Sequence, residues 1–300
     1  MPKQKQKNDL VHQPVLTKEV IGCLGPKPGQ SYLDLTAGYG GHAAAVIKAT
    51  GSPELATLVD RDLAATKSLK ERFKGSGAHI VQSDFLSTLQ ALVSENQGFD
   101  MILADLGVSS PHLEQAQRGF SFNLPGPLDM RMDQSQQLSA DNIVNHLPEA
   151  ELAEIFRKYG EEPKSRSIAR AIVAKRPVKS TEELAAIISN AVGWRGRRGK
   201  IHPATRGFQA IRIAVNDELA QLEQGLPLTL ELLKPGGRLA IISFHSLEDR
   251  IVKQFMAEHA GKTLDAELNL LTKKPITASK TEIASNPRAR SAKLRAAAKK

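Results

Sequence analysis

The stretch Ser31-Tyr-Leu-Asp-Leu-Thr-Ala-Gly-Tyr-Gly-Gly-His42 decides the fold of this chain. It reads as a short apolar strand that ends at Asp34 and continues into a loop with Gly38, Gly40 and Gly41. Glycines in such a loop allow positive φ angles and close approach to a ligand, and the N–H groups at the start of the next helix point at that ligand. The stretch therefore predicts a strand–loop–helix unit that binds a small molecule.

An acidic residue follows this loop at the interval that nucleotide-binding sheets use. A second apolar strand, residues 55–59, ends at Asp60 about 20 residues beyond the glycines, where a Rossmann-like fold binds the hydroxyls of a ribose. Nicotinamide sites hold a pyrophosphate at the loop, which the Asp34 carboxylate would repel. A carboxylate suits the ammonium and sulfonium groups of S-adenosylmethionine instead. The loop therefore predicts S-adenosylmethionine as the cofactor, and a glycine-rich turn without a ligand is the alternative.

Length and composition bound the class of protein. The 300 residues are 41% hydrophobic and 24% charged, as in a globular protein with one large or two smaller domains. No apolar run approaches the ~20 residues of a membrane span, and the first residues lack the apolar core of a signal peptide. Cys23 is the only cysteine, which excludes an intrachain disulfide and a cysteine-based metal cluster. We expect a cytoplasmic protein.

The basic residues are clustered, and the net charge is +9 at pH 7. The clusters lie in residues 3–7, 194–200 and 288–300. Each neutralised phosphate adds favourable counterion release, so such clusters favour a polyanionic substrate. For the two terminal clusters, solvated tails are an equal alternative.

Strands and helices alternate in the first third of the chain. Helices such as 43–49 and 62–73 separate strands that we expect at 31–35, 55–59, 78–82 and 100–104. This order predicts a parallel sheet with right-handed crossovers, which binds its ligands at the carboxyl ends of the strands. The strand-end residues that meet at this crevice are Asp34, Asp60, Asp84-Phe85 and Asp105.

A helical segment interrupts this pattern after Asp105. Apolar residues from Leu152 to Tyr159 have helical spacing, residues 165–175 form a second helix, and the capping box Ser180–Glu183 opens a third. We therefore predict a helical insertion over residues 112–215 within a core made of residues 1–111 and 216–300.

The parallel pattern resumes near residue 216. An apolar strand over 233–243 and a helix over 247–258 are expected to precede an antiparallel hairpin of 267–272 with 289–295. The last residues, 296–300, read as a solvated tail. The whole pattern is the doubly wound α/β fold of methyltransferases with a C-terminal antiparallel hairpin.

A series of motifs runs in order from residue 12 to about residue 295. They are His12–Val15, Thr36–His42, Asp60-Arg-Asp62, Asp105–Pro111, Arg118–Phe122, Pro127–Met132, His202–Arg212, Val215-Asn216 with Glu218-Leu219, Ser243–Arg250 and Asn286–Ser291. Together they resemble the bacterial 16S ribosomal RNA (cytosine-N4) methyltransferases, the RsmH (MraW) family.

The resemblance implies a class I S-adenosylmethionine-dependent methyltransferase core with an inserted helical domain for RNA recognition. It implies methyl transfer to the exocyclic N4 of a cytidine in the decoding region of 16S rRNA in the small ribosomal subunit. Two residues depart from the family pattern: His112 stands where the family often has Gln, and Tyr39 replaces a small or basic residue. The cofactor positions that carry over are Gly40, Gly41, His42, Asp60, Phe85, Asp105 and His112.

Methyl transfer to an amine needs alignment and a proton acceptor. The displacement at the methyl carbon is in line, and the N4 lone pair is delocalised into the ring, so an acceptor for the amine hydrogens assists. Asp105 is the first candidate, by analogy with the strand-end residue of DNA amino-methyltransferases; it can instead hold the cofactor. His245 is a second candidate. Phe120, Phe122 and Phe244 are candidates for stacking on the base, and ordinary core residues otherwise.

Arginines in the insertion are candidate RNA contacts. Arg166 and Arg170 lie four residues apart and hence on one helix face, and Trp194 offers a stacking surface amid positive charge. Arg197, Arg198 and Arg206 complete the set, with a solvated helix face as the alternative. The spacing of the histidines matches no metal-ligand pattern, so we expect no metal.

Other functions compete with RNA methylation. They are an amino-methyltransferase for DNA or protein, a nicotinamide-dependent oxidoreductase, and an RNA-binding assembly protein without turnover. The sequence leaves open a homodimer, and whether free RNA or an assembled subunit is the substrate.

Overall fold

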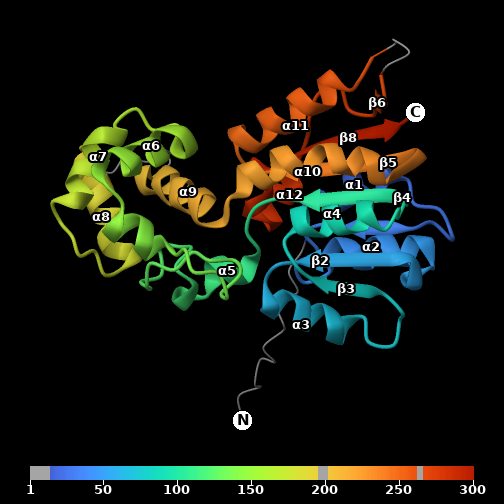
Figure 1. Ribbon diagram of the computed structural model, residues 1–300, viewed down its shortest axis with the longest axis horizontal. Helices are drawn as coiled ribbons and strands as arrows, with labels where there is room; N and C mark the ends of the chain where they lie inside the picture. The colour runs from blue at the N-terminus through green and yellow to red at the C-terminus, as the bar shows by residue number, and fades with distance from the viewer. Residues whose placement is uncertain (1–13, 195–201, 262–265) are drawn as a thin grey trace.

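The protein is described here by a computed structural model, which covers residues 14–194, 202–261 and 266–300. Its centre is a mixed sheet of eight strands in the order β3-β2-β1-β4-β5-β8-β6, with β7 paired to β8 (Figure 1). The strands are β1 Tyr32–Asp34, β2 Ala56–Asp60, β3 His79–Gln82, β4 Phe99–Asp105, β5 Leu233–Ser243, β6 Leu268–Leu270, β7 Ile276–Thr277 and β8 Lys293–Lys299.

Helices cover both faces of the sheet. Buried side chains of α1 and α2 pack on one face, and those of α4, α10 and α11 pack on the other. The α-helices are α1 Thr17–Leu24, α2 Gly41–Thr50, α3 Leu63–Arg72, α4 Phe85–Ser94, α5 Ser110–Glu114, α6 Glu149–Gly160, α7 Ser165–Val173, α8 Thr181–Ala191, α9 Pro203–Asn216, α10 Glu218–Leu232, α11 Ser246–Glu258 and α12 Lys280–Ser285. Short helical turns lie at Pro53–Leu55, Ala116–Arg118, Asn142–His146 and Pro287–Ser291.

The doubly wound fold predicted from the sequence is confirmed. Strands β1 to β5 are parallel neighbours, and their bounds fall within two residues of the predicted strands. At the carboxyl edge Asp105 of β4 pairs with Ile242 of β5. This sheet, with antiparallel strands after β5, is the Rossmann-like sheet of class I methyltransferases.

The prediction for the C-terminal residues is wrong in two respects. The antiparallel pairing of β6 is confirmed, but its partner β8 spans Lys293–Lys299 instead of 289–295, and the predicted solvated tail is most of this strand. Ala296 and Ala297 are fully buried, and Arg295 is fixed by a 2.7 Å bond to Asp249. The two lysines that end the chain read as solvated, but the three alanines before them are small enough for the strand to fit between β5 and β6.

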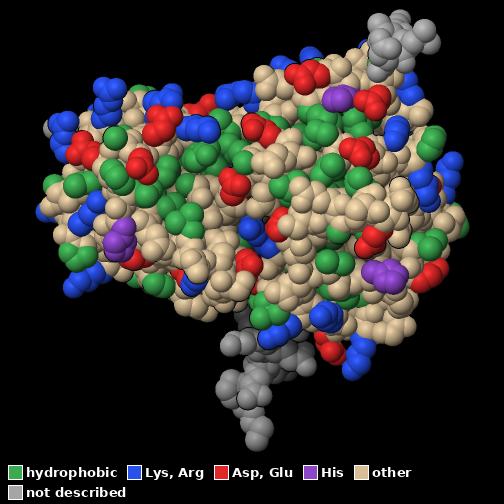
Figure 2. Space-filling view, viewed as in Figure 1, with side chains coloured by type: hydrophobic (Ala, Val, Ile, Leu, Met, Phe, Trp, Pro, Cys, Tyr) green, Lys and Arg blue, Asp and Glu red, His purple; other side chains and the backbone are tan. Residues whose placement is uncertain are grey.

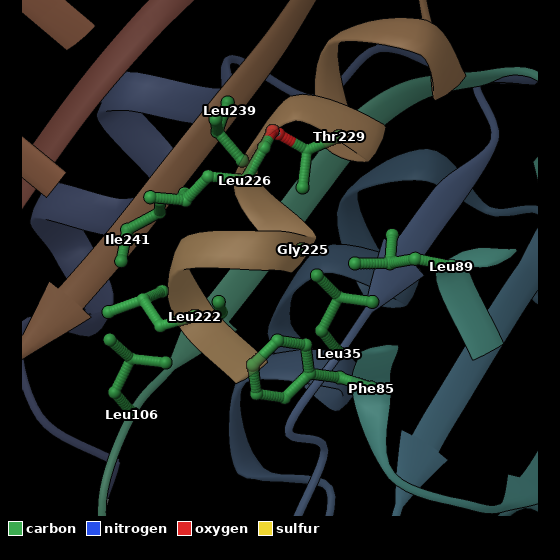
Figure 3. A pocket seen from close by; sticks show the side chains of 11 residues that line it. Leu35, Phe85, Leu89, Leu106, Leu222, Gly225, Leu226, Thr229, Leu239 and Ile241 are labelled. Carbon is green, nitrogen blue, oxygen red and sulfur yellow. The ribbon is translucent and has the colours of Figure 1, made fainter. Parts of the chain in front are cut away.

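Helix α10 packs closely against α4 and the sheet. Gly225 makes this possible, because a β-carbon there would lie 2.9 Å from the ring of Phe85. The contact leaves an apolar space of about 10 Å³ (Figure 3), room for no more than one water molecule. Side chains that face this space in Figure 3 come from both helices and from β5. The interior behind the carboxyl edge is therefore filled, which leaves the edge itself as the open part.

The insertion has its own hydrophobic cluster. Every fully buried member of that cluster comes from residues 120–215, whereas the two clusters of the sheet draw on residues 15–106 and 222–297. Helix α8 begins as predicted, with Ser180 accepting a hydrogen bond from the N–H of Glu183. Helices α6, α7 and α8 lie away from the sheet, and α9 leads back to it (Figure 1). Over the described ranges, no helix has the length and apolarity to cross a membrane.

Candidate active site

A cleft of about 880 Å³ follows the carboxyl edge of the sheet. One wall consists of the loops after β1, β2, β4 and β5, and the other consists of α9 and the segment that precedes the insertion helices. Most of the predicted site residues line it. These are Gly38, Gly41, His42, Asp60, Phe85, Asp105, His112 and His245, together with the three candidate stacking residues Phe120, Phe122 and Phe244.

The three glycines after β1 have different roles. Gly38, with a φ of 53°, lines the cleft, and a β-carbon there would meet only one carbonyl oxygen, 3.9 Å away. Gly41 also lines the cleft and packs against Pro14. Gly40, with a φ of 78°, faces α3 instead, where a β-carbon would lie 2.8 Å from the ring of Phe73. Gly40 therefore serves the packing of the loop on α3, and the other two glycines leave room for a ligand.

Asp60 is held by the glycine loop. Its Oδ2 accepts a hydrogen bond from the N–H of Gly38 and its Oδ1 accepts one from the N–H of Asp62, both at 2.8 Å. Burial raises the pKa of Asp60, and these two N–H groups offset part of that rise. A carboxylate has about four lone-pair sites, so each oxygen can still accept from a ligand hydroxyl. This arrangement fits the predicted contact with a ribose.

Asp34 lies behind the loop rather than in the cleft. Its carboxylate accepts from the Tyr32 hydroxyl at 2.7 Å and from the N–H of Thr36 at 3.3 Å. The residue is 1% exposed, and burial raises its pKa to about 6. Asp34 is absent from the residues that line the cleft. Asp34 therefore shapes the loop from behind, and its predicted contact with a cofactor stays a prediction.

Asp105 and His42 present unpartnered polar atoms to the cleft. Oδ2 of Asp105 lies 3.6 Å from Nε2 of His42. Oδ1 of Asp105 and both ring nitrogens of His42 are buried without a hydrogen-bond partner among the described residues. Burial lowers the pKa of His42, but the neighbouring carboxylates of Asp105 and Asp34 raise it by more. Buried polar groups are normally paired, so these atoms fit the amine, hydroxyl and ring groups of S-adenosylmethionine.

The chain enters the insertion through a buried ion cluster, here called the entry joint: Asp62, His112 and Arg118. Oδ2 of Asp62 lies 2.6 Å from Nε2 of His112 and 3.0 Å from a guanidinium nitrogen of Arg118. Burial raises the pKa of Asp62, but the bonds from His112, the N–H of Ala64 and Arg118 lower it by more, to about 2. The His112 ring also stacks on Phe120 at 4.8 Å. His112 thus forms part of the cleft wall while its ring nitrogens are held from behind.

The chain leaves the insertion through a second polar cluster, here called the exit joint: Arg212, Asn216 and Glu218. The Arg212 guanidinium donates two bonds to the Glu218 carboxylate, each 2.8 Å long. The buried Asn216 side chain bonds the backbone of Met130 and Met132. Neither joint was predicted as a site; the motifs Asp60-Arg-Asp62, Arg118–Phe122 and Val215-Asn216 contained their residues without showing that they meet.

His245 and Glu248 form a reciprocal cap at the start of α11. Nδ1 of His245 accepts from the N–H of Glu248 at 3.3 Å, and Oε2 of Glu248 accepts from the N–H of Phe244 at 2.8 Å. Because Nδ1 is an acceptor, we assign the proton of the neutral ring to Nε2. This assignment makes Nε2 of His245 a donor, whereas the sequence makes this residue a candidate proton acceptor.

The free nitrogen of His245 lies between carboxylates. Nε2 is buried without a hydrogen-bond partner, although Oε1 of Glu248 is 3.2 Å away in an unsuitable direction. One oxygen each of Glu218 and Glu248 lies within 4.8 Å of a His245 ring nitrogen. Arg212 already neutralises Glu218 with both bonds, so a guanidinium supplies the positive charge that a metal ion would bring.

The predicted RNA contacts do not lie together. Arg166 and Arg170 are exposed on α7, on the outer side of the insertion, where Figure 2 shows Lys and Arg side chains along the rim. Arg206 is exposed on α9, whose neighbouring residues Thr205 and Gln209 line the cleft. Trp194 is half-buried and meets His202 edge-on. Arg197 and Arg198 lie outside the described residues.

Comparison with known proteins adds to this geometry. The model of the MraW methylase family matches residues 9–300. The ribosomal RNA small subunit methyltransferase H of a Nostoc species is 51% identical over 290 residues, which cover 96% of this chain and 92% of the relative. The protein of the same name from Synechocystis is 49% identical over 302 residues, covering 99% and 96%.

A solved rRNA methylase from Streptococcus thermophilus is a distant neighbour, with 9% identity and a TM-score of 0.42 over 94% of this chain and 93% of that one. The family match covers the sheet, the cleft and the insertion alike. S-adenosylmethionine is therefore the methyl donor of this enzyme, and the chain belongs to the MraW methylase family.

Proposed function

We propose that this enzyme transfers the methyl group of S-adenosylmethionine to the exocyclic N4 of a cytidine in the decoding region of 16S rRNA, within the small ribosomal subunit. The names of its relatives support an rRNA of the small subunit as the substrate. The observation that carries the proposal is that one cleft contains both the cofactor residues and the aromatic side chains of Phe120, Phe122 and Phe244. A base removed from an RNA strand needs such apolar faces.

The chemistry follows from the cleft. Bound S-adenosylmethionine would supply the methyl group, its sulfur keeping the electron pair of the broken bond, while residues of the cleft would align the N4 amine and accept the proton that it releases. Asp105 faces the cleft with an unpartnered carboxylate oxygen, and we propose that it contacts the reacting amine or the cofactor there. The enzyme contributes mainly by aligning the two reactants.

The insertion is proposed to hold the RNA. We propose that residues 112–215 form a domain apart from a core of residues 1–111 and 216–300, in agreement with the separate hydrophobic clusters. Arg166, Arg170, Arg206 and Trp194, with Arg197 and Arg198, are its proposed contacts to RNA. A ribosomal substrate makes the cytoplasm the site of the reaction. A homodimer stays a prediction that sedimentation of the purified chain tests.

Tritium transfer tests the function. Small subunits that lack the modification receive labelled S-adenosylmethionine and the enzyme, and the digested RNA is analysed by nucleoside mass spectrometry. We expect N4-methylcytidine, located in the decoding region by sequencing of RNA fragments. Label in another nucleoside would overturn the N4 assignment, and absence of label despite cofactor binding would favour an assembly protein without turnover.

Asp60→Ala tests the cofactor half of the cleft. The change removes the acceptor that holds Gly38 and faces the proposed ribose, so calorimetry with S-adenosylhomocysteine should show a loss of about 1–3 kcal/mol, typical of a lost charge-assisted hydrogen bond. Glu154→Gln, on the exposed face of α6 in the insertion, is the control and should bind as the unchanged protein does. Equal affinity of the Asp60 variant would remove this residue from the ribose contact.

A further inference from the structure

His245 and Glu248 together offer one hydrogen-bond donor and one acceptor. They complement a ligand that presents an acceptor next to a donor. Nε2–H of His245 is a donor without a partner, and Oε1 of Glu248, 3.2 Å from it, is an acceptor. Both side chains line the cleft, and His245 and Glu248 are otherwise buried, with side chains 8% and 3% exposed. Nε2 of His245 is itself buried, and both side chains border the cleft, so the pair is placed to meet a base that fills this part of the cleft.

The negative charge of Glu248 is stabilised by the groups around it. Burial raises the pKa of Glu248, but the nearby His245 side chain, the charge of Arg212 and the N–H of Phe244 lower it by more, so the carboxylate is ionised and accepts hydrogen bonds. Arg212 is in turn fixed by its two bonds to Glu218. The exit joint therefore keeps the Glu248 carboxylate ionised and able to accept a hydrogen bond.

The pair lies beside the cofactor residues. Asp105 at the end of β4 is paired with Ile242 of β5, and His245 follows Ile242 by three residues, a span of about 10 Å along the chain. The Phe244 ring lies 3.5 Å from the β-carbon position of Gly107, just beyond Asp105. A base in contact with His245 would thus have its reacting edge between the pair and the cofactor side of the cleft.

We propose that His245 and Glu248 recognise the Watson–Crick edge of the target cytosine, an inference that rests on the proposed function. Cytosine offers the N3 acceptor next to the N4 amine donor. Nε2–H of His245 would donate to N3, and Oε1 of Glu248 would accept from N4, as acidic side chains accept from this amine in nucleic-acid recognition. Uracil presents a donor at N3 and an acceptor at O4, which is the reverse pattern. The pair therefore selects cytosine over uracil.

His245→Asn is the decisive variant. Asparagine is a good N-cap residue and keeps an acceptor for the N–H of Glu248, but it is too short to place a donor where Nε2 lies. We expect kcat/KM for methyl transfer to small subunits to fall about 10–100-fold, the scale of one lost base contact. Affinity for S-adenosylhomocysteine and the unfolding temperature should stay as in the unchanged protein.

Glu248→Gln tests the acceptor. Glutamine keeps an oxygen for the N–H groups of Phe244 and His245 and removes the charge, and we expect a similar 10–100-fold loss. The controls come from the other end of α11, where His259 pairs with Glu267 at 2.8 Å outside the cleft. His259→Asn and Glu267→Gln should methylate within twofold of the unchanged enzyme.

Competition with altered subunits separates recognition from folding. Subunits that carry uridine at the modified position should inhibit the unchanged enzyme at least 10-fold more weakly than subunits with unmodified cytidine. For His245→Asn this difference should shrink several-fold, because only Glu248 then distinguishes the amine of cytosine from the carbonyl of uracil. If this variant methylates normally or keeps the full preference, the recognition proposal is wrong while the function stands. If the unchanged enzyme forms no N4-methylcytidine at all, the proposed function itself fails.

Discussion

The entry joint and the exit joint join the same two parts of the molecule, but they leave different atoms exposed to the cleft. In the entry joint, Asp62 is shared by His112 and Arg118, and Arg118 also bonds two backbone carbonyls of the insertion. Its charged atoms point at one another. The exit joint adjoins His245, whose Nε2 has no partner. In the entry joint both partners bond the shared carboxylate, although Nε of Arg118 is buried without a hydrogen bond, whereas the exit joint supports an open hydrogen-bonding group.

This difference separates stability from chemistry. A closed buried ion cluster contributes a defined geometry, and removal of one member leaves an uncompensated charge. An open group costs stability because its polar atom is desolvated without a bond, and a ligand recovers that cost. We therefore expect changes in the entry joint to act mainly on folding and changes in the exit joint to act mainly on turnover.

The largest expected effect is that of Arg118→Met. Methionine preserves much of the volume but leaves Asp62 with His112 alone, so unfolding in urea should show a loss of about 3–5 kcal/mol. Cofactor affinity per folded molecule should change little. If the free energy of unfolding fell by less than about 1 kcal/mol, the entry joint would not be a main stabilising contact. The proposed difference between the two joints would then be wrong.

Acid tests the same joint without Arg118 being changed. The pKa of Asp62 is lowered to about 2 from an ordinary 3.8, so its contribution is complete above pH 4 and is lost as the pH falls through 2. The shift corresponds to about 2–3 kcal/mol. Stability measured by urea from pH 5 to pH 2 should fall less steeply for Asp62→Asn than for the unchanged protein. Parallel curves would contradict the assignment.

Glu218→Gln sharpens the comparison at the exit joint. The amide keeps an acceptor for Arg212 but loses the charge, so we expect the free energy of unfolding to fall by about 1–2 kcal/mol. The rate of methyl transfer should fall by a larger factor than the population of folded protein does. Glu154→Gln, which removes the charge from the exposed pair with Arg157, is the control and should change neither. If Glu218→Gln lost as much stability as Arg118→Met and kept normal turnover, the exit joint would act on folding and not on turnover, contrary to this comparison.

The smallest effects are expected on the surface of the insertion. Arg206→Gln on α9, next to the cleft, should change how subunit binding depends on salt. The slope of the logarithm of the binding constant against the logarithm of the salt concentration should become shallower by about one or less, as expected for the loss of one phosphate contact. Arg166→Gln on the outer helix α7 should change it less. Both variants should bind S-adenosylhomocysteine normally. Equal effects of the two would mean that RNA runs along the outer helices as well as over the cleft.

Local patterns were sufficient to predict the sheet. Short apolar strands that end in Asp34, Asp60 and Asp105 predict a parallel sheet, because adjacent residues encode each strand, its turn and the following helix. The same adjacency explains the helix starts, including the cap at Ser180. The error at β8 has the opposite cause: its alanines and lysines are weak strand formers, and only burial between β5 and β6 makes them one.

The site was predictable only in part. Asp60, Asp105 and His42 could be placed because strand ends meet at one edge. The joints could not, because Arg118 lies 56 residues from Asp62 and no local pattern shows that a distant arginine will be buried beside a given aspartate. The orientation of Gly40 and Asp34 likewise depends on α3 and Tyr32. Contacts of this kind become visible only in three dimensions.

Strand β8 has a consequence for the order of synthesis. It pairs with β5 through six residue positions and also with β6 and β7. Chains are made from the N-terminus onward, so β5 keeps an open edge and β6 lacks its neighbour until residue 299 has been added. The sheet that supports the cleft therefore closes only after translation of this strand.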